Sequence, residues 1–237
     1  MIAAPRYVLS MFGCTLWHSA RVVLAAGRGA EHVAGGPFDQ VPREYARDLL
    51  RINRITVQGE GLEHLTAVGA CVYVANHQSW LDILAVLEVL PGSLRFVAKK
   101  ELGRVPLFGR ALRAAGHIEI DRRNLDSAVG AYQAAATAIR GGLSAIVFAE
   151  GTRSRDGRLM AFKKGPFVLA IVAQVPVVPV AILGSYEALP KGSIRPRPVP
   201  ITVRVGIPIP TTGLSYDDRD SLAARTRLAL LGLGVRA

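Results

Sequence analysis

The sequence predicts an α/β fold in which a mostly parallel sheet is flanked by helices, with an N-terminal helical membrane-associating segment. Short apolar runs alternate along the chain with segments of helical spacing, which is typical of a parallel sheet covered on both faces. Half of the 237 residues are hydrophobic and only a fifth are charged, so the chain can form a sizeable core.

The first 52 residues have mainly helical character, with a glycine-rich interruption from Gly27 to Pro37. We therefore divide the chain into a membrane-docking segment, residues 1–52, and one α/β domain, residues 53–237. The apolar stretch that opens the chain resembles a signal-peptide core, but Arg6 is its only charged lead-in.

A membrane-spanning helix needs about 20 consecutive apolar residues, and His18 and Arg21 interrupt this one. The sequence therefore favours a helix that lies in the membrane interface or packs on the core. A second apolar stretch, Phe167 to Leu183, contains two prolines, Pro176 and Pro179, which exclude one continuous helix. It predicts a helix ending near Ala173, followed by a buried strand.

Beyond residue 52, apolar runs of strand length and helical segments follow one another in strict order. The expected strands are a first one starting at Ile55, then Cys71–Ala75, Arg95–Ala98, His117–Ile120, Ser144–Ala149, Val177–Leu183 and Ile201–Val205. The expected helices are Leu81–Leu90, Val105–Ala115, Leu125–Arg140, Gly165–Ala173 and Ser215–Leu231. In such sheets ligands bind beyond the carboxyl ends of the strands, where all the motifs below fall.

The chain is strongly basic, with 29 Lys and Arg against 18 Asp and Glu and a net charge of +11. Such a charge implies an anionic partner. The basic residues are dispersed and are not interleaved with aromatics, so an anionic membrane surface and a phosphorylated substrate are favoured over nucleic acid. Two cysteines, Cys14 and Cys71, give neither a disulfide framework nor a zinc site, and they indicate an intracellular protein.

The strongest chemical signal is His77, two residues after a predicted strand, followed by Asp82 at the start of a predicted helix. A carboxylate at this separation can bind the imidazole Nδ1–H, which leaves the other ring nitrogen free to take a proton from a hydroxyl. The substrate hydroxyl would then attack directly, without a protein nucleophile. Alternatively, Ser79 to Asp82 is a helix capping box, worth about 1 kcal/mol and no chemistry.

A second polar group, Glu150-Gly151-Thr152-Arg153, follows the strand that ends at Ala149. Glu150 could accept from a substrate hydroxyl while Arg153 pairs with phosphate. An ordinary turn with a local ion pair, worth under about 1 kcal/mol, fits the same spacing.

Three basic pairs stand at predicted strand or helix ends and could surround one anion. They are Lys99-Lys100, Arg122-Arg123 and Lys163-Lys164.

Four ordered blocks resemble the 1-acylglycerol-3-phosphate acyltransferase family of glycerolipid acyltransferases, over roughly residues 55–210. The first is the His-x4-Asp run around His77, and the second extends from Phe96 to Arg122. The third is Phe148–Ser154, which has Ala149 where the family usually has proline, and the fourth is Val175–Val180.

The resemblance implies a role for each matching position. His77 would be the general base and Asp82 its orienting carboxylate. The acceptor's glycerol phosphate would be held by Glu150, Gly151, Thr152 and Arg153, with help from Arg122 and Lys100. Pro179 would shape an acyl pocket.

The implied reaction moves a fatty acyl group from acyl-CoA or acyl carrier protein to the free hydroxyl of a lysophospholipid, without metal or bound cofactor. The implied location is the cytoplasmic face of the cell membrane, as a peripheral or monotopic protein. Two alternatives stay open: the same chemistry on another lysolipid, such as an amino-acid-derived lysolipid or a glycolipid, and a catalytically inactive membrane-binding homologue.

Overall fold

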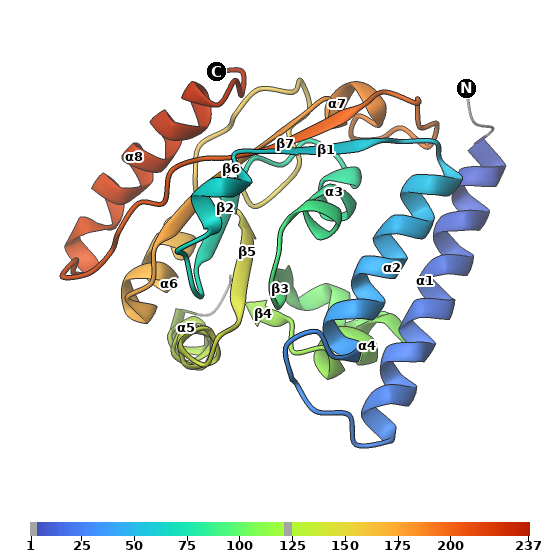
Figure 1. The fold of residues 1–237 in the computed structure, drawn as a ribbon, viewed down its shortest axis with the longest axis horizontal. Coiled ribbons are helices and arrows are strands. Elements are labelled where there is room, and N and C mark those ends of the chain that lie inside the picture. The colour runs from blue at the N-terminus through green and yellow to red at the C-terminus, as the bar shows by residue number, and fades with distance from the viewer. Residues whose placement is uncertain (1–3, 121–124) are drawn as a thin grey trace.

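The structure is a computed structural model that describes residues 4–120 and 125–237, and its centre is one seven-stranded sheet (Figure 1). The strand order is β1-β7-β6-β2-β5-β3-β4. The strands are β1 (Val57–Glu60), β2 (Val72–Ala75), β3 (Leu94–Lys99), β4 (Ile118–Ile120), β5 (Ser144–Phe148), β6 (Val177–Leu183) and β7 (Ile201–Val205). Strands β2 to β6 run parallel, whereas β7 is antiparallel to β6 and parallel to β1. The predicted fold class, an α/β protein with a mostly parallel sheet, is confirmed.

Helices cover both faces of the sheet (Figure 1). On one face lie α1 (Ala4–Gly27), α2 (Pro37–Ile52), α3 (Leu81–Val89), the short 3-10 helix η2 (Lys100–Arg104), α4 (Phe108–Ala114) and α7 (Ser185–Ala188). On the other face lie α5 (Leu125–Arg140), α6 (Gly165–Ala173) and α8 (Arg219–Gly232). Two further 3-10 helices are η1 (Leu62–Leu65) and η3 (Tyr216–Asp218).

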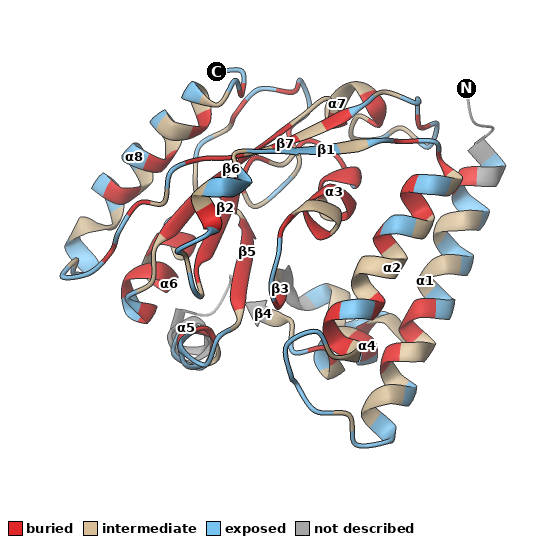
Figure 2. Cartoon of the chain, in the orientation of Figure 1, coloured by how far each residue is buried: buried red, intermediate tan, exposed pale blue. Residues whose placement is uncertain are grey.

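The central strands β2, β5 and β6 are apolar at nearly every position, because each face of the sheet meets a helix layer. In β2, Tyr73 and Ala75 join the core beneath α3, while Val72 and Val74 join the core beneath α5 and α6. Figure 2 shows the central strands buried, whereas α1 keeps exposed turns along its outer side. The polar groups of the site therefore gather at the strand ends, where the two cores stop.

Helix α2 packs between α1 and α3 and ties the N-terminal segment to the sheet. The two residues that interrupt the apolar stretch of α1 face α2, where His18 bonds Asp48 at 3.1 Å and Arg21 bonds Glu44. Deeper in the fold, Asp39 of α2 pairs with Arg95 of β3 at 2.8 Å, and both side chains are buried. The polar residues of α1 thus turn inward, which leaves an outer face that is largely apolar.

Some predicted boundaries move. The first strand begins at Val57 instead of Ile55, because Ile55 N donates to Leu50 O in the turn that ends α2. The predicted helix Val105–Ala115 is shortened to α4 (Phe108–Ala114), since the residue before a proline, here Val105, disfavours helical backbone.

Candidate active site

The polar groups of the site lie beyond the carboxyl ends of two adjacent parallel strands, β2 and β5. Asn76 fixes the chain as it leaves β2: its side chain accepts from Ile182 N at 2.7 Å and donates to Ile182 O at 2.9 Å, so it extends the pairing with β6. His77 follows at once, and Ser154 N donates to His77 O at 2.8 Å. The backbone around the predicted base is therefore held by β6 on one side and by the loop after β5 on the other.

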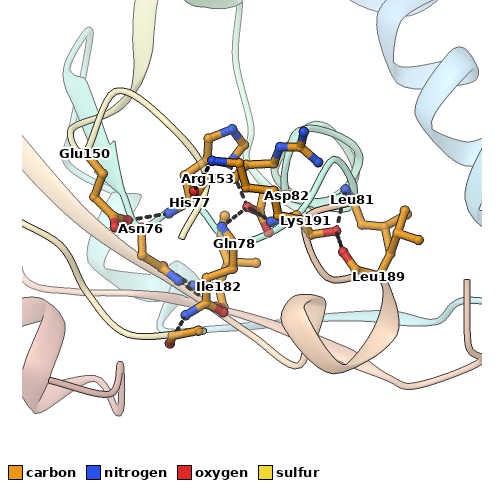
Figure 3. Close-up of polar contacts among 12 residues, drawn as sticks. Asn76, His77, Gln78, Leu81, Asp82, Glu150, Arg153, Ile182, Leu189 and Lys191 are labelled. Carbon is orange, nitrogen blue, oxygen red and sulfur yellow. Dashed lines mark hydrogen bonds and ion pairs between the residues drawn. The ribbon is translucent and has the colours of Figure 1, made fainter. Parts of the chain in front are cut away.

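The structure brings His77 and Asp82 together (Figure 3). The distance from His77 Nδ1 to Asp82 Oδ2 is 2.8 Å, and the Asp82 side chain is fully buried. A carboxylate only accepts, so the proton lies on Nδ1 and the lone pair of the neutral ring lies on Nε2. This is the geometry of a base with its orienting carboxylate.

The same carboxylate oxygen also fixes the turn that leads into α3. Asp82 Oδ2 accepts from Gln78 N at 2.7 Å and from Ser79 N at 2.8 Å, while Ser79 Oγ accepts from Leu81 N at 3.2 Å. Half of the predicted capping box is therefore present, the Asp82 carboxylate bonded to Ser79 N, and it uses the same atom as the catalytic interpretation. The cap fixes the carboxylate where the imidazole needs it.

The His77 ring is stacked on Phe148, with ring centroids 4.0 Å apart and planes 15° apart. Phe148 is the last residue of β5, so the strand next to β2 supplies the surface on which the ring lies. Stacking and the Asp82 bond together fix the ring plane. No local sequence pattern predicts this contact, because it depends on the pairing of two strands distant in the chain.

Glu150 was predicted to accept from a substrate hydroxyl, but in the structure both of its carboxylate oxygens accept from backbone N–H groups. It is buried, its Oε1 accepts from His77 N at 2.7 Å, and its Oε2 accepts from Met160 N at 2.9 Å. Burial raises the pKa of this carboxyl, and the two backbone N–H groups act in the opposite direction. Glu150 does not line the cavity described below. Its position is therefore suited to holding the backbone of His77 and not to binding substrate.

The other residues of the third block, Gly151, Thr152 and Arg153, do face the cavity. Gly151 has a φ of 74°, a conformation that favours glycine, and it turns the chain from the buried Glu150 back towards the site. The Arg153 guanidinium lies over the Trp80 ring, 4.8 Å from its centroid. Burial lowers the pKa of Arg153, whereas the Asp82 and Tyr7 side chains raise it.

Two neighbours of Arg153, Trp80 and Lys191, were not predicted as site residues. Trp80 lies within the His-x4-Asp run, but no pattern marks its contact with Arg153. Lys191 lies in a loop far along the chain, yet it comes close to Arg153 (Figure 3), where its Nζ donates to Arg153 O at 3.0 Å. The same Nζ donates to Thr152 Oγ1 at 3.2 Å.

The three predicted basic pairs have different outcomes. Arg122 and Arg123 lie outside the described residues, and the side chains of Lys99 and Lys100 also lie outside the described part. The prediction for Lys163 and Lys164 is wrong: Lys164 pairs with Asp220 of α8 at 3.0 Å, and neither lysine lines the cavity. Helix α6, which they precede, belongs to the opposite helix layer.

A cavity of about 610 Å³ opens beside His77 and extends between the α1–α2 pair and the core. Its walls are mainly apolar and come from α1, α2, α3, α4 and β3, for example Met11, Val22, Ile83, Phe96 and Ala111. Its polar side is formed by His77, Thr152, Arg153 and Lys191. Pro179 does not line it, since this residue is buried in β6 against Gly206. Among the described residues, no cluster of His, Cys, Asp and Glu could hold a metal ion.

A histidine oriented by a carboxylate, beside a basic turn and an apolar cavity at the ends of parallel strands, is an arrangement that suits acyl transfer. In agreement, a family model described as Acyltransferase matches residues 54–183, and the chain belongs to this family.

Within that family, the relatives are 1-acyl-sn-glycerol-3-phosphate acyltransferases. The one from Limnanthes douglasii is 41% identical over 93% of this chain and 73% of its own length. The one from Cocos nucifera is 39% identical over 86% of this chain and 65% of its own length, and the alpha form from Homo sapiens is 39% identical over 75% and 63%. The chain therefore spans about two thirds of these relatives.

A solved structure gives the same result. The crystal structure of the 1-acyl-sn-glycerophosphate acyltransferase PlsC from Thermotoga maritima superposes with a TM-score of 0.68 and 28% identity. The match covers 84% of this chain and 80% of that one. The resemblance predicted from the four sequence blocks is confirmed.

Proposed function

We propose that the protein transfers a fatty acyl group from a thioester to the free hydroxyl of 1-acylglycerol-3-phosphate, forming phosphatidic acid. The observation that carries the proposal is the His77–Asp82 pair, whose His77 lines an apolar cavity together with Arg153. The names of the relatives support this choice of acceptor.

In the proposed reaction, His77 Nε2 takes the proton of the acceptor hydroxyl as its oxygen attacks the thioester carbonyl carbon. Asp82, bonded to Nδ1 at 2.8 Å, stabilises the imidazolium that forms. When the tetrahedral intermediate collapses, the C–S bond breaks and the thiolate leaves, taking up the proton from the imidazolium. The ester is formed and the base is restored.

The acceptor's phosphate would lie against Arg153 with Gly151 and Thr152 of the same turn, and the family resemblance adds Arg122 and Lys100. Glu150 would act indirectly, through its bond to His77 N. The cavity would hold the acyl chain, because its walls are mainly apolar. Acyl-CoA and acyl carrier protein are both suitable donors.

We also propose that residues 1–52 dock the enzyme on the cytoplasmic face of the membrane as a peripheral or monotopic segment, with residues 53–237 as the acyltransferase domain. Large apolar residues are exposed on the outer face of α1, among them Leu9, Phe12 and Trp17. Within the described part of the chain one stretch, Tyr7–Gly27, is long and apolar enough to cross a membrane. The net charge of +11 would attract anionic lipid.

A transfer assay tests the proposal. The purified protein is incubated with labelled acyl-CoA or acyl carrier protein and with lysophosphatidic acid, an amino-acid-derived lysolipid or a glycolipid. Labelled phosphatidic acid is the expected main product. Transfer only to another acceptor would favour the first alternative, and vesicle binding without thioester cleavage would favour an inactive homologue.

A further inference from the structure

We propose that Lys191 supplies a second cation beside Arg153 at the headgroup site, and that this lysine sets the preference for acceptors carrying a phosphate monoester over phosphodiesters and neutral glycerides. The inference rests on the proposed acyl transfer and adds a specificity-determining residue to that site. Lys191 is the new element, since it lies outside the four sequence blocks.

The contacts of Lys191 place its charge at the catalytic turn. Its loop follows α7 and reaches back to the turn after β5, where Nζ lies 3.0 Å from Arg153 O and 3.2 Å from Thr152 Oγ1. An ammonium has three donors, so a third N–H is left for a ligand. Lys191 lines the same cavity as His77, so that ligand would be a substrate group.

Neither cation makes an ion pair within the described residues, although the charge of Asp82 acts on Arg153 from a longer distance. Lys191 and Arg153 are both half-buried, and no described carboxylate lies within ion-pair distance of either. The nearby carboxylate of Asp82 is occupied by the His77 ring and two backbone N–H groups. Burying charge without a partner is unfavourable, so the pair is suited to binding an anion.

The charge of the pair matches one headgroup class. A phosphate monoester carries about −1.5 to −2 at pH 7, whereas a diester carries a single negative charge and a monoacylglycerol none. Two cations held together at this turn neutralise a phosphate monoester. A diester would leave one of the two cations unpaired, and a monoacylglycerol would leave both. Lys191 would thus act on binding directly and also hold the backbone that carries Arg153.

The test compares three acceptors with one acyl donor: lysophosphatidic acid, lysophosphatidylglycerol and monoacylglycerol. The variants are Lys191→Met, Lys191→Arg and, as a matched control, Lys164→Met, whose lysine pairs with Asp220 on the opposite layer. In Lys191→Met, kcat/KM for lysophosphatidic acid should fall by about tenfold or more, the scale of one charge-assisted hydrogen bond. For monoacylglycerol the fall should be under about threefold. Lys191→Arg should retain most of the preference, and Lys164→Met all of it.

Equal losses on all three acceptors would overturn the proposal, because they would mean that Lys191 only supports the loop. No loss on lysophosphatidic acid would also overturn it. Equilibrium binding of lysophosphatidic acid and monoacylglycerol to the same proteins tests the inference separately from turnover: the preference of the wild type should shrink in Lys191→Met, and an unchanged preference contradicts the inference. A wild type that binds with this preference but transfers to none of the acceptors contradicts the proposed reaction alone.

Discussion

Asp82 combines two tasks in one oxygen atom. Oδ2 accepts from the His77 ring and from two backbone N–H groups at 2.7 and 2.8 Å, so the start of α3 and the orientation of the base depend on the same carboxylate. Within the described residues no donor reaches the other oxygen, Oδ1, which is buried. Replacing this residue should therefore affect activity and stability to different extents.

Asp82→Asn keeps the size of the side chain but removes its charge. We expect kcat to fall by at least about a hundredfold, because the neutral amide no longer stabilises the imidazolium. The free energy of unfolding should fall by only about 1 kcal/mol, the value of a helix cap. Turnover and urea denaturation measured on one preparation check both values. A variant with activity within tenfold of the wild type would mean that Asp82 is a cap alone.

His117 makes stability depend on pH. Its Nδ1 accepts from Phe96 N at 3.0 Å, and burial, with a contribution from the charge of Arg95, lowers the pKa of His117 to about 3. The unfolded chain binds this proton below its ordinary pKa of about 6.5, and the folded chain does not until about pH 3. This contribution to stability is therefore complete above about pH 6.5 and is lost as the pH falls towards 3.

Denaturation of the wild type between pH 7 and 4 should show this loss, at up to about 1.4 kcal/mol per pH unit from this one residue. The control is His117→Asn, which keeps an acceptor for Phe96 N but does not titrate. Its stability should depend less on pH over the same range. Parallel curves for the two proteins would show that His117 is not the group responsible.

At the scale of elements, the helix α1 has reversed polarity. Its inner face carries His18 and Arg21, both bonded to α2, while its outer face exposes large apolar side chains. Polar contacts between helices, combined with an apolar outer surface, suit a helix pair that faces lipid.

Replacing three exposed residues of α1 together, Leu9, Phe12 and Trp17, by serine should weaken binding to anionic vesicles by about tenfold or more, since buried apolar area drives interfacial binding. The melting temperature should stay nearly constant, because these side chains do not contribute to the core. Vesicle sedimentation checks the first expectation and calorimetry the second. As a control, Ile207→Ser with Leu228→Ser removes equally exposed apolar residues away from α1 and should leave binding unchanged.

The elements also show what a sequence can predict. The predicted bounds of α5, α6, β6 and β7 coincide with the observed ones. These bounds follow from the spacing of apolar residues and from flanking prolines or glycines, which are local features of the sequence. The positions of Glu150, Lys164 and Lys191 could not be predicted in this way, because they depend on which segments distant in the chain come into contact. Glu150 meets the backbone of His77 across two strands, Lys164 faces the opposite layer, and Lys191 arrives through an irregular loop. No local pattern encodes such contacts.

At the scale of the whole molecule, the N-terminal helices and the sheet domain enclose the cavity jointly. Walls from α1 and α2 face walls from α3, α4 and β3, so the surface that would meet lipid is the outer side of the helices that line the cavity. An acyl chain could pass from the membrane to His77 with little exposure to water. The size of this cavity should then limit chain length.

Ala111 of α4 is a suitable position to test that limit, because it lines the cavity and is nearly buried. In Ala111→Phe we expect kcat/KM for long-chain thioesters to fall by about tenfold or more relative to short-chain ones, since overpacking costs about 1–3 kcal/mol. A series of saturated acyl-CoA substrates measures the ratio. An equal loss at every length would mean that the chain binds elsewhere.

The most direct test of the whole mechanism is the turnover of His77→Ala with lysophosphatidic acid and a thioester donor. We expect kcat to fall by about a thousandfold or more, because no base remains to take the hydroxyl proton. Vesicle binding and melting temperature should stay close to those of the wild type, since the ring lies at the cavity and its backbone contacts persist. A His77→Ala protein that folds and still turns over within tenfold of the wild type would contradict the assignment of His77 as the base.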